Sequence, residues 1–242
     1  MHTLFYIIMN IDFENEIEEL RELKNTGTVI ETDQYAQMRI TCLQESIRCF
    51  LIEKYGPPPY IVEMTLDFPE SMRDNDCDNI QDLETITIEL GSIEHVPYSV
   101  YYFLENMVNR FTGGVFHRNA PHVLQARLNK GNEVPSMAFQ EYNPECSHQK
   151  YTLGFAGRPS TAGHFYISTR DNSRNHGPGS QGSKTEADCY IGKIIGGIND
   201  IAIVERMQTQ PGVSRKNGMI DDSSHHIKIV SINVSKTESK LK

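Results

Sequence analysis

Apolar residues are spaced differently in the first quarter of the chain and in the rest of it. Ile17, Leu20 and Leu23 are three positions apart, and residues 33–54 continue with steps of mostly three or four. Such spacing places the apolar side chains on one face of a helix. The pattern therefore predicts two helices within an N-terminal extension, residues 1–57, which a glycine and a run of prolines bring to an end.

Beyond the extension, apolar and polar residues alternate. Residues 60–68 and 84–90 both show this period of two, which is typical of half-buried strands. A polar connection joins them, so we expect an antiparallel hairpin with a long loop. Residues 99–109 predict an amphipathic helix. Short apolar pieces, separated by glycine-containing segments, follow at 115–116, 122–125, 151–156, 164–168, 190–195 and 226–234.

Many short strands with irregular loops and one or two helices are typical of a closed β-barrel rather than of a parallel α/β sheet. We therefore expect a mainly β domain over residues 58–235, followed by a polar tail over residues 236–242. Neither helix of the extension sustains enough heptads for a coiled coil. We expect these helices to dock on the barrel, and pairing with a partner protein through residues 13–54 is the alternative.

Composition narrows the class of protein. The chain has 242 residues, of which 38% are hydrophobic and 23% are charged, as in globular proteins with a buried core. Its net charge of -9 argues against nucleic acid as a partner, because phosphate binding draws on positive charge. The apolar run over residues 4–9 is too short to span a membrane. We expect a cytoplasmic protein by default, and the secretory pathway if this run is a truncated signal anchor.

Motifs for metals, redox chemistry and phosphate are weak. The five cysteines include no CxxC pair, and Cys42 and Cys49 lie two helical turns apart, too far for a disulfide. We expect reduced thiols. The neighbouring His225 and His226 point to opposite faces at a strand start, so we predict no metal site. Residues 169–188 are polar and rich in glycine but lack the spacing of a phosphate-binding loop, and we interpret them as a connection.

Several short motifs occur in a suggestive order. They are VPYSV at 96–100, FHR at 116–118, LGFAG at 153–157, GHFYI at 163–167, GKIIGG at 192–197 and VERM at 204–207. This order resembles that of the cyclophilins, peptidyl-prolyl isomerases with an eight-stranded antiparallel barrel capped by two helices. No single motif is specific, but their succession covers residues 59–234. The resemblance implies a cyclophilin-like barrel that binds proline-containing peptides or protein clients and needs no cofactor.

The resemblance also implies a catalytic arginine, Arg118. Rotation about an X-Pro bond is slow because amide resonance must be lost, at a cost of about 18–20 kcal/mol. A guanidinium that donates to the proline nitrogen in the twisted state stabilises the form with a localised lone pair. Such a reaction requires no nucleophile, general base or metal. An ordinary surface arginine is the alternative for Arg118.

The resemblance assigns the rest of the substrate site as well. The residues are Phe116, Val123, Leu124, Gln125, Phe155, Ala156, His164, Phe165, Tyr166 and Asp188. Some of them differ from the family in chemical type: Phe155 stands at a usual asparagine, His164 at a glutamine and Asp188 at a histidine. A structural histidine and a solvated turn aspartate are the alternatives for the last two. Val123 and Leu124 are smaller than the family's Phe and Met, which weakens contact with proline by about 1–3 kcal/mol.

These departures leave functions of different classes open. Retention of Arg118 favours a peptidyl-prolyl isomerase. The replacements at Phe155, His164 and Asp188 favour a cyclophilin-fold module that binds proline-containing peptides or a scaffold partner without useful catalysis. A third alternative is that the N-terminal helices carry the biology through a partner. The chain has no tryptophan, which predicts weak binding of cyclosporin.

Overall fold

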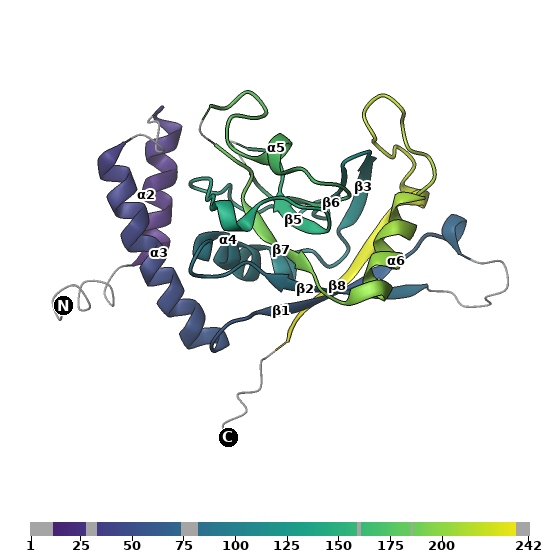
Figure 1. Cartoon of the computed structure of the whole chain (residues 1–242), viewed down its shortest axis with the longest axis horizontal. Coiled ribbons are helices and arrows are strands. Elements are labelled where there is room, and N and C mark those ends of the chain that lie inside the picture. Colours follow the sequence, from purple (N-terminus) through teal and green to yellow (C-terminus); the bar gives the residue numbers. More distant parts are fainter. Residues whose placement is uncertain (1–11, 28–32, 74–81, 159–160, 185, 236–242) are drawn as a thin grey trace, which may run out of the picture.

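The computed structural model describes residues 12–27, 33–73, 82–158, 161–184 and 186–235 (Figure 1). Eight antiparallel strands form a closed barrel in the order β1-β2-β7-β5-β6-β4-β3-β8. The strands are β1 (Ile61–Asp67), β2 (Leu83–Leu90), β3 (Val115–Ala120), β4 (Val123–Arg127), β5 (Thr152–Phe155), β6 (His164–Ser168), β7 (Tyr190–Ile194) and β8 (Ile227–Ser235). The predicted closed antiparallel barrel is confirmed.

Alternation along the strands builds the barrel core. In β1, Val62, Met64 and Leu66 are fully buried, whereas the intervening Glu63 is exposed. Alternate side chains of a strand point to opposite faces, so this pattern turns one face of the sheet inward. Strands β1 and β2 pair antiparallel, as the predicted hairpin requires.

Two helices precede the barrel, as predicted. They are α2 (Phe13–Asn25) and α3 (Gln34–Tyr55). Each begins with an aspartate whose side chain accepts a hydrogen bond from the first turn: Asp12 from the Asn15 amide, and Asp33 from the Ala36 amide. Such caps satisfy backbone donors that have no partner within the helix.

The helices dock on the barrel domain, where Figure 1 shows them beside α4 (Pro97–Tyr101). Phe13 of α2 and Phe50 of α3 pack around Tyr101, with ring centroids 5.1 to 5.8 Å apart. Arg21 donates from Nε to the Ser136 carbonyl at 2.8 Å. The buried side chains of both helices belong to the same hydrophobic cluster as the barrel interior. Docking, the first of the two expectations for this extension, is confirmed.

The helix predicted over residues 99–109 differs from expectation. It begins at Pro97, and beyond α4 it continues as a π-helical segment, Tyr102–Met107, and a 3-10 turn, Val108–Arg110. It is not amphipathic over its first half, because every residue of α4 is buried. The segment contacts both α3 and the barrel strand β7, which leaves no solvent face there.

Two more helices follow, α5 (Ser173–His176) and α6 (Gly197–Gln208). Helix α6 packs against β2 and β7. The short α5 lies within residues 169–188, which the sequence analysis interprets as a connection.

Some sequence-based predictions concern residues outside the described part of the chain: the apolar run at 4–9, Cys77 and the tail at 236–242. The other four cysteines are free; Cys42 and Cys49 are exposed, and Cys146 and Cys189 are buried. Over the described residues, no helix has the length and apolar character needed to cross a membrane.

Candidate functional site

A row of four residues runs across the outer face of the barrel. Arg118 of β3 lies opposite Gln125 of β4, Gln125 opposite Tyr166 of β6, and Tyr166 opposite Gly154 of β5. Antiparallel pairing thus brings together positions that are up to 48 residues apart in the sequence. The FHR motif and the GHFYI motif meet in this row.

A β-bulge determines the direction of Arg118. Phe116 and Arg118 are two positions apart, and in a regular strand their side chains would share a face. The register of β3 against β4 shifts between them, so His117 is the extra residue. Phe116 is fully buried in the barrel, whereas Arg118 reaches the outer surface. The sequence alternation alone would have directed Arg118 inward.

Two hydrogen bonds hold the Arg118 guanidinium. Its Nε donates to the Asn217 carbonyl at 2.9 Å, and its Nη1 donates to Oε1 of Gln125 at 3.0 Å. An arginine carries five N–H donors, so several remain for a ligand. The side chain is half-buried and held in position.

The guanidinium borders a cavity of about 530 Å³. The lining residues are Arg118, His122, Val123, Gln125, Ala156, Gly157, Tyr166, Arg170, Asn175, His176, Ser180, Gln181 and Asp188. Most of them are polar. Val123 and Ala156 pack against Tyr166 and form a small apolar surface within this lining. The cavity lining therefore combines a small apolar surface with a larger polar part, here called the polar wall.

Tyr166 forms part of the polar wall. Its hydroxyl donates to Oδ2 of Asp188 at 3.1 Å and lies 3.2 Å from Nδ1 of His148. A side chain at Gly154 has no room here, because a Cβ would lie 2.4 Å from the tyrosine oxygen. Burial, reinforced by the charge of Asp188, raises the pKa of Tyr166 well above its ordinary value. Tyr166 therefore enters the site as a neutral hydroxyl.

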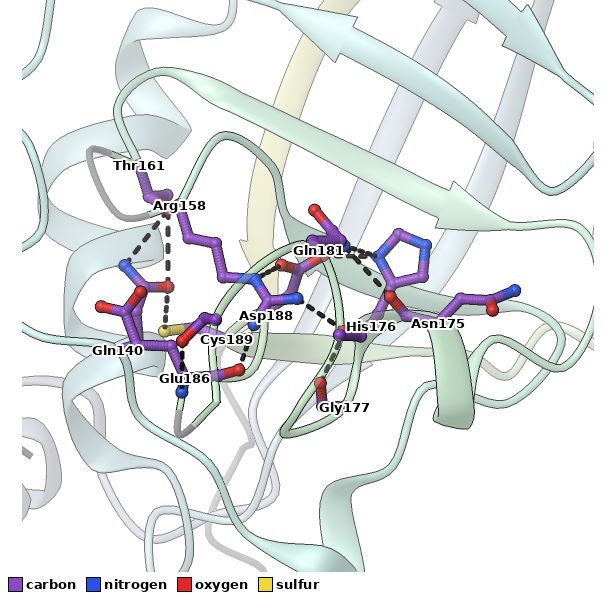
Figure 2. Close-up of polar contacts among 12 residues, drawn as sticks. Gln140, Arg158, Thr161, Asn175, His176, Gly177, Gln181, Glu186, Asp188 and Cys189 are labelled. Atoms are coloured by element: carbon purple, nitrogen blue, oxygen red, sulfur yellow. Dashed lines mark hydrogen bonds and ion pairs between the residues drawn. The ribbon is translucent and has the colours of Figure 1, made fainter.

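Asp188 is the centre of a buried charged network. Figure 2 shows Arg158 and His176 on opposite sides of its carboxylate. The Arg158 Nε lies 2.7 Å from Oδ1, and both side chains are only 3% exposed. His176 contacts Oδ2 through Nδ1. Burial by itself would raise the pKa of Asp188, but the hydrogen bond with His176 and the charge of Arg158 outweigh it and lower the pKa. The alternative of a solvated turn residue is wrong.

Several predicted site residues lie in the barrel interior instead. Phe116, Leu124, Phe155 and Phe165 are at most 1% exposed. Phe116, Leu124 and Phe165 lie on β3, β4 and β6, and other residues of these strands border the cavity. All four side chains belong to the hydrophobic core. The structure does not bring their side chains to the cavity. Of the predicted substrate-contacting set, it brings together Val123, Gln125, Ala156, Tyr166 and Asp188 beside Arg118.

His164 lies at a different place. It precedes Tyr166 by two positions and shares its face, but it borders a separate groove with Arg127 and Leu128. Its Nδ1 is buried without a hydrogen-bond partner within the described residues. Burial, with a smaller contribution from the charge of Arg127, lowers the pKa of His164. His164 is therefore a neutral imidazole away from the cavity, and its unpaired Nδ1 differs from the satisfied structural histidine that was the alternative considered from the sequence.

Most of the polar wall was missed by sequence reasoning. Asn175, His176, Ser180 and Gln181 all belong to the glycine-rich segment interpreted as a connection. Arg158 supports that segment, donating from Nη2 to the Ser180 hydroxyl at 2.8 Å. His176 was the one signal within the segment that it surrounds a buried charge, because the other partner of Asp188, Arg158, lies outside it.

Comparison of the chain with models of protein families and with curated proteins finds no match. Across the described residues, no group of three or more His, Cys, Asp or Glu side chains is arranged to hold a metal ion. The cavity and the residues that border it are therefore the features of the described structure that point to a function.

Proposed function

We propose that the chain is a cyclophilin-like peptidyl-prolyl isomerase that binds proline-containing segments of proteins in the cavity beside Arg118. The observation that carries this proposal is the fixed Arg118 guanidinium at the cavity edge, held by the Asn217 carbonyl and by Gln125. The order of sequence motifs, which resembles that of the cyclophilins, and the closed eight-stranded barrel support it.

The reaction requires only that the site binds the twisted state of the X-Pro bond more strongly than its planar states. As the X-Pro bond twists, the nitrogen becomes pyramidal and its lone pair becomes available as an acceptor. A free N–H of Arg118 donates to this nitrogen in the twisted state more strongly than in either planar state, which lowers the barrier. The apolar surface of Val123 and Ala156 supplies contact for the pyrrolidine ring. No covalent bond forms or breaks.

A second candidate function is binding of such peptides with little turnover. The polar wall favours it, because Tyr166, His176 and Asp188 present hydrogen-bonding groups where a proline ring needs apolar contact. Leaving polar groups unpaired against an apolar ligand costs free energy. The two candidates share the site and differ in whether binding is stronger in the twisted state.

NMR exchange spectroscopy on an Ala-Pro peptide tests both candidates. We expect the protein to accelerate cis/trans exchange, and Arg118→Ala to reduce the acceleration about 100-fold, the usual effect of removing one transition-state donor. Arg127→Ala is the matched control, since Arg127 is an exposed arginine on the next strand that does not border the cavity. It should leave exchange unchanged.

The other outcomes separate the candidates. Shifts of the peptide signals without faster exchange would establish the binding module and overturn the isomerase. Absence of both effects would overturn both candidates. An equal loss in Arg127→Ala and Arg118→Ala would contradict a specific role for Arg118.

A further inference from the structure

The rim of the cavity carries concentrated positive charge in an acidic protein. Arg118 and Arg170 both border the cavity, with His122 alongside. The net charge of the chain is -9, so the positive charge of this cluster is opposite in sign to that of the whole protein. Within the described residues, Arg170 forms no ion pair or hydrogen bond, and its guanidinium is exposed. It is therefore available to a ligand.

Hydrogen bonds fix the backbone that carries Arg170 and His122. The Thr169 amide donates to the His122 carbonyl at 3.0 Å, and the Asn172 side chain donates to the same oxygen at 2.8 Å. The Thr169 hydroxyl donates to the Pro121 carbonyl. The turn between β3 and β4 is thus joined to the segment that follows β6. A cation held on such a joined segment loses less conformational entropy when it binds an anion.

The nearby carboxylates do not neutralise this rim. Asp188 is the one acidic residue among the described residues that border the cavity, and it pairs with Arg158 and His176. Asp171 follows Arg170 directly, but its carboxylate accepts hydrogen bonds from the amide and the hydroxyl of Ser173. Both acids are therefore occupied within the protein.

The state of His122 agrees with this picture. Burial lowers its pKa, and the nearby His176, Arg118 and Arg170 lower it further. At neutral pH the imidazole is uncharged and offers an N–H donor without repelling the arginines. The combination of two guanidinium groups and one neutral donor matches the acceptors of a carboxylate or phosphate group.

We propose that Arg118, His122 and Arg170 form an anion subsite that selects peptides with an acidic or phosphorylated side chain next to the proline. The inference rests on the proposed function, because it assumes that a proline-containing segment occupies the cavity. Its support is independent of catalysis: the unpaired cation of Arg170, carried by a segment that is joined to the β3–β4 turn, and the absence of a free carboxylate from the described cavity lining.

Binding of three matched peptides to the full chain tests this subsite. They contain Ala-Pro, Glu-Pro and phosphoserine-Pro in otherwise identical sequences, and dissociation constants come from titrations monitored by NMR. We expect phosphoserine-Pro to bind about tenfold more tightly than Ala-Pro, with Glu-Pro between them, because charge-assisted hydrogen bonds are about twice as strong as neutral ones. Raising the salt concentration should reduce this preference.

Variants assign the preference to the rim. Arg170→Gln should reduce the ratio of the two affinities to about twofold. Lys228→Gln removes one positive charge from β8, away from the cavity lining, and should preserve the ratio. A ratio that falls equally in both variants would overturn the subsite in favour of a general charge effect.

The peptide series also separates this inference from the proposed function. Equal affinities for all three peptides, with Ala-Pro still bound, would overturn the anion subsite and leave the proposed function standing. Failure of every peptide to bind would overturn both.

Discussion

Two neighbouring rows of residues on the same four strands lie in opposite environments. The outer row consists of Arg118, Gln125, Tyr166 and Gly154, and its first three residues border the candidate site. The inner row consists of Phe116, Ala126, Phe165 and Phe155, all of them at most 1% exposed. Phe165 packs against the rings of Phe103, Phe111 and Phe116. One row stabilises the barrel, and the other carries polar chemistry.

The comparison shows that adjacent residues of one strand can belong to the barrel core and to the candidate site. Phe165 and Tyr166 are adjacent aromatic residues of β6, yet one lies in the barrel core and the other in the cavity wall. On β3 the separation needs a bulge, since Phe116 and Arg118 would otherwise share a face. The position of a residue relative to the pleat and the bulge, rather than its type, determines its role.

The largest effect is expected in the inner row. Phe165→Ala should reduce the free energy of unfolding by about 3–5 kcal/mol, because a large ring is removed from the aromatic cluster and leaves a cavity. Urea denaturation measures the change. Tyr142→Ala is the control, since that aromatic side chain is 39% exposed, and it should cost about 1 kcal/mol or less. Equal losses in the two variants would contradict the assignment of Phe165 to the core.

A smaller effect is expected where the two rows meet at β5. Gly154→Ala should destabilise the protein by about 1–3 kcal/mol, because the new methyl group overlaps the tyrosine oxygen and the His148 ring. Urea denaturation is again the measurement. Adding Tyr166→Phe to this variant should recover part of the loss. No recovery would show that the tyrosine hydroxyl is not what excludes a side chain at Gly154.

Acid should destabilise the protein through the bulge residue. Burial, together with the charge of Arg127, lowers the pKa of His117 to about 4. The unfolded chain takes up this proton near pH 6.5, and the folded chain does not. The free energy of unfolding therefore falls as the pH drops from about 6.5 to 4, by at most about 2 kcal/mol from this residue.

The variant His117→Phe separates this contribution from those of other groups. It removes the titrating ring and should make the fall between pH 7 and pH 4.5 smaller than in the unmodified protein. Thermal or urea unfolding at several pH values measures it. An unchanged fall would place the acid sensitivity elsewhere, for example at His148, whose pKa is also lowered by burial and which therefore acts in the same pH range.

The smallest effect on stability is expected in the outer row. Gln125→Ala should change the free energy of unfolding by about 1 kcal/mol or less, because its bond to Arg118 is only partly buried. Its effect on peptide exchange should be larger, about a tenfold loss, since Arg118 is no longer held in place. Gln125→Glu retains an acceptor and should retain exchange. If Gln125→Ala and Gln125→Glu lost exchange equally, Gln125 would not act by positioning Arg118.

Much of the fold was predictable because the local patterns were clear. Alternation predicted β1 and β2, and short apolar pieces marked the other six strands. The three-to-four spacing predicted α2 and α3, since an amphipathic face docks wherever a core accepts it. The all-buried α4 was less clear, because a helix covered on both sides loses the amphipathic pattern on which prediction depends.

Part of the candidate site was predictable as well. The motif order directed attention to Arg118, Gln125 and Tyr166, which the structure places in one row. The same reasoning assigned His164 to that site, but the structure places it beside a separate groove. Sequence order cannot distinguish these positions, because the face of a residue depends on bulges and on the neighbouring strands.

By itself, the sequence determined the eight strands, the two N-terminal helices and the class of barrel, because alternation and helical spacing are local properties of the chain. Only the tertiary structure decided that Asp188 is buried between Arg158 and His176, and that Arg170 stands beside His122. Arg158 and His122 come from other segments than His176, Asp188 and Arg170, and the folding of the barrel brings them together. A buried charge is tolerated only where oppositely charged or hydrogen-bonding groups surround it, and a local sequence pattern does not show which groups these are.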